Sequence, residues 1–218
     1  MNPLYDLHTH TILSDGEMLP IELLRRAAVL GYETVAITDH ADRSNVADLL
    51  EVVGRVKESA LCYGVTLLAG VELTHVPPEH IPALARYAKQ RGADIVVVHG
   101  ETVMEPVAPG TNRAAVSCEY VDVLAHPGLI AEEDAESAAE LGIALEITSR
   151  GGHNRTNGHV LQVARKAGCR IVVDSDAHAP SDLMSREARR AVALGAGMTE
   201  QECTEALSQD IHRLLHRR

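Results

Sequence analysis

The chain of 218 residues contains no phenylalanine and no tryptophan, and aromatic residues make up only 2% of it. Its interior must therefore be filled by Val, Leu, Ile and Ala, which suits buried parallel strands packed against helices. Rings that could stack on nucleic-acid bases are equally scarce, so the composition argues against a binder of long single strands.

Basic residues are few as well. Lys and Arg number 20 against 31 Asp and Glu, which gives a formal net charge of −11. Such a chain lacks the positive path that long nucleic acids and anionic membrane surfaces require. No apolar run reaches transmembrane length and no signal-type segment stands at the N-terminus. We expect a soluble, cytoplasmic protein with no membrane partner and no long nucleic-acid partner.

Cysteines are too widely separated to form a framework. The four residues Cys62, Cys118, Cys169 and Cys203 include no CxxC pair. This spacing argues against a disulfide-stabilised or thiolate-zinc protein and predicts reduced thiols in or near the core.

Histidine, by contrast, is abundant, with 12 residues, and six of the histidines follow apolar runs that are typical of β-strands. Together with nearby carboxylates they form a set of nine potential metal ligands: His8, His10, Asp15, His40, Glu72, His99, His126, Asp176 and His178. A single histidine at a strand end is usually structural, but seven segments that end in this way indicate one shared pocket. Imidazoles combined with carboxylates suit Zn²⁺, Mn²⁺ or Fe²⁺, and the lack of Cys ligands favours an open catalytic site.

Strand-like and helix-like segments alternate along the whole chain. The predicted strands are Leu4–Leu7, Thr34–Thr38, Thr66–Val71, Ile95–Val98, Val121–Ala125, Ala144–Ile147 and Arg170–Asp174. The predicted helices are Pro20–Leu30, Val46–Tyr63, Pro78–Gln90, Glu132–Leu141, Gly158–Ala167 and Asp182–Leu194. Seven βα units predict an α/β fold, a seven-stranded (β/α)7 TIM-like barrel in one domain over residues 1–218, with all strand C-termini at one rim.

The segment from Thr199 to the end predicts a separate amphipathic helix. Thr199 and Glu202 match a capping box, and Cys203, Leu207, Ile211 and Leu214 fall on one face. We expect this helix at 199–218 to pack on a barrel spanning residues 1–195. Its use as a dimerisation helix is the alternative, so oligomers through this segment stay open.

Six motifs resemble the polymerase-and-histidinol-phosphatase (PHP) superfamily: "DLHTHTILSDG", "AITDH", "GVE", "VVHG", "AHPG" and "DSDAH". The resemblance covers residues 1–195 and implies a distorted barrel with two or three divalent metal ions at its rim. It assigns the first ion to His8, His10, Glu72 and Asp176, the second to Glu72, His99 and His126, and the third to Asp15, His40 and His178. Glu72 is then a bridging ligand.

The resemblance implies hydrolysis of phosphate esters, and the physical chemistry agrees. Two ions can clamp the attacking and leaving oxygens, and a metal-bound hydroxide at such a trinuclear site is available at neutral pH. Three divalent ions against the three carboxylates of the set leave the pocket at about +3, suited to phosphate. Besides the bridging Glu72, Asp176 and His178 are the candidates for proton transfer.

Two loops are candidates for substrate recognition. Residues 99–113 carry Glu101 and Arg113, and residues 149–159 carry Arg150, His153 and Arg155. Arginine binds phosphate in a bidentate manner, and Arg150 is favoured because it follows a strand end most closely. The alternative is that these arginines only tie down surface loops.

The leading functional prediction is a hydrolase of small phosphomonoesters, similar to histidinol-phosphate phosphatase, although members with that activity tend to be longer. The alternative is a nucleotide phosphatase or a 3'-5' exonuclease-type phosphodiesterase. A metal-storing barrel is disfavoured because a degenerate member would have lost ligands. A metal-dependent amidohydrolase is disfavoured because Lys57, Lys89 and Lys166 fall on helices, whereas such barrels often place a bridging lysine at a strand end.

Overall fold

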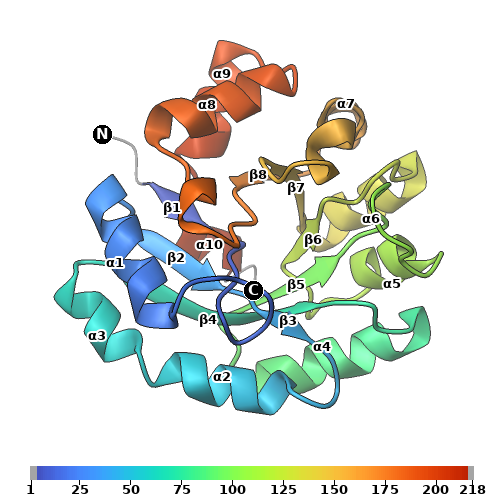
Figure 1. The fold of residues 1–218 in the computed structure, drawn as a ribbon. Helices are drawn as coiled ribbons and strands as arrows, with labels where there is room; N and C mark the ends of the chain where they lie inside the picture. The colour runs from blue at the N-terminus through green and yellow to red at the C-terminus, as the bar shows by residue number, and fades with distance from the viewer. Residues whose placement is uncertain (1–3, 216–218) are drawn as a thin grey trace.

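The computed structural model describes residues 4–215, without the side chains of residues 212 and 213. Parallel strands follow one another around a ring in the order β1-β2-β4-β5-β6-β7-β8, and short β3 pairs with β4 (Figure 1). The strands are β1 (Tyr5–Asp6), β2 (Thr34–Ile37), β3 (His40–Ala41), β4 (Thr66–Leu73), β5 (Ile95–His99), β6 (Val123–Ala125), β7 (Ala144–Thr148) and β8 (Ile171–Asp174). The predicted seven-stranded TIM-like barrel is confirmed.

Most of the helices surround this ring (Figure 1). They are α1 (Pro20–Leu30), α2 (Val46–Gly54), α3 (Lys57–Cys62), η1 (Pro78–His80), α4 (Ile81–Gln90), α5 (Thr111–Val116), α6 (Glu132–Leu141), η2 (His153–Thr156), α7 (Asn157–Ala167), η3 (Pro180–Asp182), α8 (Arg186–Gly195), α9 (Glu200–Leu207) and α10 (Ile211–Leu215). The predicted helix Val46–Tyr63 is wrong in one respect, because the chain breaks it into α2 and α3. The predicted helix at Asp182 begins only at Arg186, where the Ser185 hydroxyl caps it.

Alternation along β4 sends successive side chains to opposite sides of the strand. Val71 and Leu73 pack toward the outer helices, whereas Leu68 packs inside the barrel with side chains of the other strands. Glu72 shares the inward phase of Leu68 and stands near the C-terminal end of β4. An inward carboxylate at this depth must be held by charge or metal, since burial alone is costly.

The barrel closes through a polar seam between β1 and β8. The Leu7 amide donates to Asp174 Oδ1 at 2.9 Å, and the Ser175 amide donates to Asp6 Oδ1 at 3.2 Å. Beyond the two strands, Thr9 and Ala177 form an isolated parallel bridge. Carboxylates thus replace part of the backbone ladder where the ring closes.

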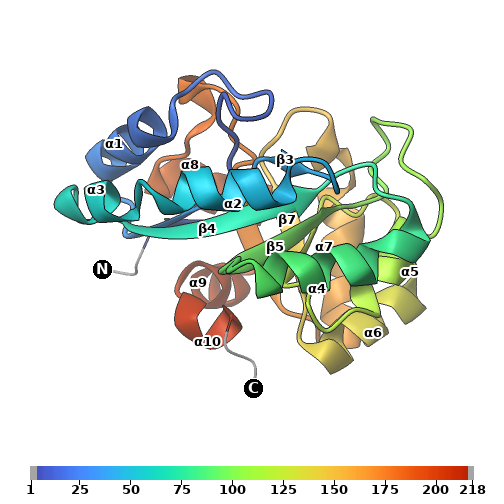
Figure 2. The same cartoon turned by 90° about the horizontal axis from the view of Figure 1, so that it is seen from below.

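The tail forms two short helices instead of the predicted single helix. The break lies after α9, and α10 then turns under the barrel, opposite β3 (Figure 2). Ile211 and Leu214 pack into the interior cluster that includes Tyr5 and Val97. Because these side chains are buried within the chain, they are not available as the apolar face of a dimerisation helix. The predicted residues 216–218 of that helix lie outside the described residues.

Among residues 4–215, no helix has the length and apolar character needed to cross a bilayer. The four cysteines are free thiols; Cys118 and Cys203 are buried, Cys169 is partly buried and Cys62 is exposed.

We expect a thiol reagent such as dithiobis(nitrobenzoate) to modify one cysteine rapidly in the native protein and the other three only after denaturation. Burial raises the pKa of Cys169 to about 12 and also raises the pKa values of Cys118 and Cys203, so little thiolate forms there. Absorbance measures the released thiolate. Cys62→Ser should remove the fast phase, and a second fast thiol would contradict the packing described.

Candidate metal centre

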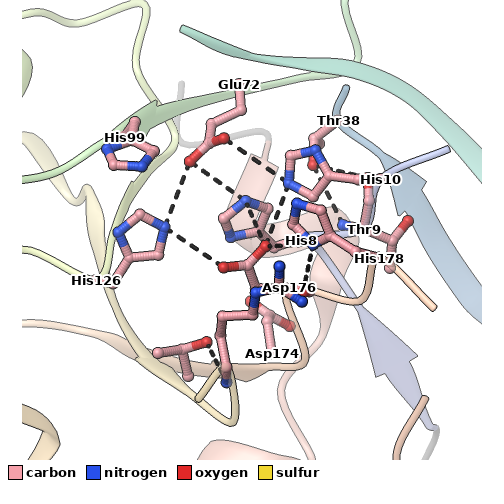
Figure 3. A network of polar contacts seen from close by, with 12 residues as sticks. His8, Thr9, His10, Thr38, Glu72, His99, His126, Asp174, Asp176 and His178 are labelled. Carbon is pink, nitrogen blue, oxygen red and sulfur yellow. Dashed lines mark hydrogen bonds and ion pairs between the residues drawn. The ribbon is translucent and has the colours of Figure 1, made fainter. Parts of the chain in front are cut away.

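The barrel brings the predicted ligands to one rim, as Figure 3 shows for most of them. Each ligand comes from the end of a strand or the loop that follows it: His8 and His10 follow β1, His40 opens β3, Glu72 lies in β4, His99 ends β5, His126 follows β6, and Asp176 and His178 follow β8. Asp15 lies in the loop before α1 and approaches His178 and His40.

Glu72 and Asp176 occupy the middle of the cluster. Glu72 Oε1 lies 3.3 Å from His8 Nε2 and 3.5 Å from His126 Nε2. Asp176 Oδ1 lies 3.3 Å from His10 Nε2, and Asp176 Oδ2 lies 3.6 Å from His126 Nε2. Each carboxylate therefore spans two imidazoles, the arrangement expected of groups that bridge ions.

A third group lies nearer the solvent. Asp15 Oδ1 is 3.2 Å from His178 Nε2 and 3.4 Å from His40 Nε2. His40 also reaches inward, because its Nδ1 lies 2.7 Å from Glu72 Oε2. His178 reaches inward as well, because its Nδ1 lies 3.4 Å from Asp176 Oδ1. Two imidazoles therefore connect Asp15 to the buried carboxylates.

Neighbouring acceptors orient several of these rings. His8 Nδ1 lies 2.7 Å from Glu146 Oε1, His99 Nδ1 lies 3.2 Å from the Gly100 carbonyl, and His178 Nδ1 lies 3.0 Å from the Asp176 carbonyl. A proton on Nδ1 satisfies each contact and leaves the Nε2 lone pair free to bind a cation.

The donor set fits divalent ions on two observations. His8 Nε2, both ring nitrogens of His10, Glu72 Oε1 and Asp176 Oδ1 are buried without a hydrogen-bond partner among the described residues. Six of the nitrogen–oxygen separations given above, 3.2 to 3.6 Å, lie at or beyond the long end of good hydrogen bonds. They match the edge of about 3.3 Å of a tetrahedron with Zn–N and Zn–O bonds of about 2.0–2.1 Å.

Electrostatics inside the cluster are strongly coupled. Burial alone would lower the pKa of His8, but the carboxylates of Glu146, Asp176 and Glu72 outweigh it and raise that pKa well above its usual value. Burial would likewise raise the pKa of Glu72, and the surrounding imidazoles, His8 foremost, hold it well below its usual range. The carboxylate stays ionised, as a ligand requires.

Three residues outside the predicted ligand set also lie in the cluster: Glu146, Glu105 and His153. Glu146 on β7 holds His8 and also accepts the His126 amide at 3.0 Å. Its signal in the sequence is an acidic residue in the inward phase of an otherwise apolar strand. Glu105 and His153 come from loops, and His153, predicted to bind substrate, lies with His99 and His126. No regular pattern in the sequence marks Glu105.

The other predicted substrate residues lie in different surroundings. Arg150 lines a cavity of about 540 Å³ with Ser149, Asp182 and His153, and its Nη1 is 3.3 Å from Asp182 Oδ2. Arg113 pairs with Asp134 of α6, and Arg155 is exposed in η2. Glu101 Oε1 accepts the amides of Gly110 and Asn112, so this carboxylate holds the start of α5.

Several known proteins are similar to this chain. The family model for RNase P subunit p30 matches residues 3–218. An uncharacterized protein of Methanocaldococcus jannaschii is 50% identical over 98% of this chain and 99% of its own length. Ribonuclease P protein component 3 of Methanosarcina mazei is 30% identical, covering 94% of this chain and 85% of that protein. A probable phosphatase of Caldanaerobacter subterraneus is 31% identical, covering 79% and 75%.

Among solved structures, histidinol phosphate phosphatase of Lactococcus lactis, in complex with zinc, L-histidinol and phosphate, superposes with a TM-score of 0.64. The alignment covers 90% of this chain and 94% of that one at 16% identity, so it shows the shared fold. Fold and relatives together define a barrel of the PHP superfamily of phosphoesterases, which confirms the predicted resemblance. Within that class, the chain belongs to the family of RNase P subunit p30.

Proposed function

We propose that the protein is a metal-dependent phosphoesterase that hydrolyses a small phosphomonoester at this rim. One observation carries the proposal: buried imidazole nitrogens and carboxylate oxygens converge without hydrogen-bond partners, at separations that suit shared cations. His8, His10, Glu72 and Asp176 would hold a first ion, and Glu72 with His99 and His126 a second. Asp15, His40 and His178 would hold a third. Zn²⁺, Mn²⁺ and Fe²⁺ fit these ligands.

Bound ions would supply Lewis-acid charge and an activated water for attack at phosphorus. The chain itself orients the rings, through Glu146 for His8 and through the Asp176 carbonyl for His178. Burial of Glu72 and Asp176 excludes bulk water from the reacting centre and strengthens the electrostatic contacts there. His178 and Asp176, 3.4 Å apart, are the groups placed to hold or move a proton beside the cavity.

The size of the cavity beside Arg150 favours a small substrate over a long polymer. Asp182 links it to the ligands, because its Oδ2 accepts the His178 amide at 3.0 Å and also contacts Arg150. The guanidinium has further N–H donors beyond the one directed to Asp182. A phosphate at the ions could therefore be bound from its other side by Arg150, with the rest of the molecule in the cavity.

The family match favours a second candidate, action on RNA as a phosphodiesterase or as part of a ribonucleoprotein. The net charge of −11 disfavours direct contact with long RNA. The test is a panel of histidinol phosphate, sugar phosphates, nucleoside mono- and bisphosphates and short oligonucleotides, with metal-loaded protein and a chelator-treated control. Hydrolysis of oligonucleotides alone would favour the second candidate, and no hydrolysis of any phosphoester would refute the first.

Arg150→Ala is expected to raise KM for the best phosphomonoester about 10- to 100-fold, with a smaller effect on kcat. A hydrogen bond to a charged group contributes about 1.5–3 kcal/mol, and each 1.4 kcal/mol corresponds to a factor of ten. Steady-state kinetics measure the split between KM and kcat. Arg165→Ala is the matched control, since that arginine pairs with Glu202 on the surface. Equal kinetics for the two variants would remove Arg150 from the substrate site.

A further inference from the structure

Three imidazoles meet at the side of the rim formed by β5, β6 and the turn after β7. His99, His126 and His153 each present a ring nitrogen, and the three atoms lie within 4.8 Å of one another. The ring centroids of His99 and His126 are 4.5 Å apart, and those of His126 and His153 are 4.4 Å apart. His153 is only 8% exposed, so its ring belongs to the interior of the site.

A carboxylate faces two of these rings from the loop after β5. Glu105 Oε2 is 3.3 Å from His99 Nε2, and Glu105 Oε1 is 3.5 Å from His153 Nε2. Both separations exceed a good hydrogen bond and equal those between the other ligand candidates. The side chain is 38% exposed, so this carboxylate lies on the solvent side of the three rings.

We propose that His153 is a metal ligand that holds one divalent ion together with His99 and His126, and that Glu105 supplies an oxygen ligand from the loop. This deepens the proposed function, because it adds two ligands to the second ion of the same site. Three imidazoles select borderline metals such as Zn²⁺, Fe²⁺ or Co²⁺ over Mg²⁺ and Ca²⁺. On the side that faces the 99–113 loop, the ligand of this ion would be the Glu105 carboxylate.

Packing between two loops fixes the position of both ligands. Gly152, directly before His153, has a φ of 92° in the left-handed region. A Cβ at Gly152 would stand 2.9 Å from Met104 Cε, so the residue before Glu105 packs directly on that glycine. The loop is tied at its base as well, through Glu101 and Asn112. The two loops that carry Glu105 and His153 are therefore held next to each other by contacts that do not involve an ion.

Metal titration tests this assignment without using activity. Apo-protein is titrated with Co²⁺, bound ions are counted in competition with a chromophoric chelator, and hyperfine-shifted imidazole N–H protons are recorded by NMR. In His153→Asn we expect one ion to bind at least about tenfold more weakly, the loss known for less direct changes around metal ligands. One shifted imidazole N–H signal should disappear from the spectrum of that variant.

His80→Asn is the matched control, because this histidine is exposed on η1 and should leave the isotherm and the shifted signals unchanged. Glu105→Gln is a second variant that preserves all three rings, and it should weaken the same ion. Isotherms and NMR signals of His153→Asn and Glu105→Gln equal to those of His80→Asn would overturn the assignment. Its failure differs from failure of the proposed function, which is measured by phosphoester hydrolysis alone.

Discussion

Glu72→Gln is expected to lower kcat/KM for the best phosphoester at least about 1000-fold. This buried carboxylate approaches four of the ligand rings, those of His8, His10, His40 and His126. The amide removes one negative charge and replaces an acceptor oxygen by an N–H donor that faces imidazole nitrogens. Metal ions stabilise phosphoryl transition states by several kcal/mol, and each 1.36 kcal/mol is a factor of ten in rate.

Kinetics and metal content, the latter by atomic absorption on the same sample, measure this effect. We expect the Glu72→Gln protein to lose bound metal as well as activity, since the two ions proposed to share this carboxylate would each lose a ligand. Glu79→Gln is the control, because that glutamate is exposed on η1. Wild-type activity in Glu72→Gln would contradict a bridging role and with it the proposed mechanism. Circular dichroism of both variants checks that the fold is intact.

The barrel was predictable because most of its strands lie in apolar runs that end in polar residues. Thr66–Val71 and Ile95–Val98 were predicted within two residues of β4 and β5, since both are buried on two faces. Helix α5 was not predicted, because its six residues are too few for a helical period to show. The break between α2 and α3 falls directly after Gly54, a glycine inside the predicted helix that the helical pattern alone did not single out as an end.

The site was predictable only to the extent that strand ends gather at one rim. Strand position alone places Glu72 and His99 together, because alternation and parallel order determine where their side chains lie. Glu105 and His153 come together through the packing of Met104 on Gly152, a contact between loops that no periodic pattern encodes. Arg113 was a reasonable candidate by type, yet Asp134 on a neighbouring helix pairs with it.

The second large effect concerns the seam that closes the barrel. Arg189 on α8 is 1% exposed, its Nε donates to the Val173 carbonyl at 2.8 Å, and its guanidinium carbon lies 3.5 Å from the Tyr5 ring centroid. Asp6 and Asp174 are the buried carboxyl groups of the seam; burial raises the pKa of each, and the charge of Arg189 opposes this rise. The guanidinium of Arg189 therefore interacts with both seam carboxyl groups and with the Tyr5 ring.

Arg189→Met is expected to reduce the free energy of unfolding by about 3–5 kcal/mol at pH 7.5, the loss typical of a buried charge deprived of its partner. Arg190→Met is the control on the same helix. Arg190 is half-exposed and pairs with Glu200 at the surface, so its loss should be about 0–1 kcal/mol. Urea unfolding followed by circular dichroism measures both variants at identical metal loading, and equal losses would show that the seam does not need the charge.

The deficit of Arg189→Met should also depend on pH in a defined direction. Burial raises the pKa of Asp6 to about 6 even with Arg189 present, and removal of that charge raises it further. A carboxyl group with a raised folded-state pKa stabilises the fold fully below its unfolded value of about 3.9, and this contribution is lost as the pH rises through the folded-state value. Arg189→Met should therefore be least stable, relative to the wild type, above about pH 6, and should regain part of the difference at pH 5. A deficit that stays constant from pH 7.5 to pH 5 would instead mean that Arg189 acts through its packing on Tyr5 and not through the two seam carboxylates.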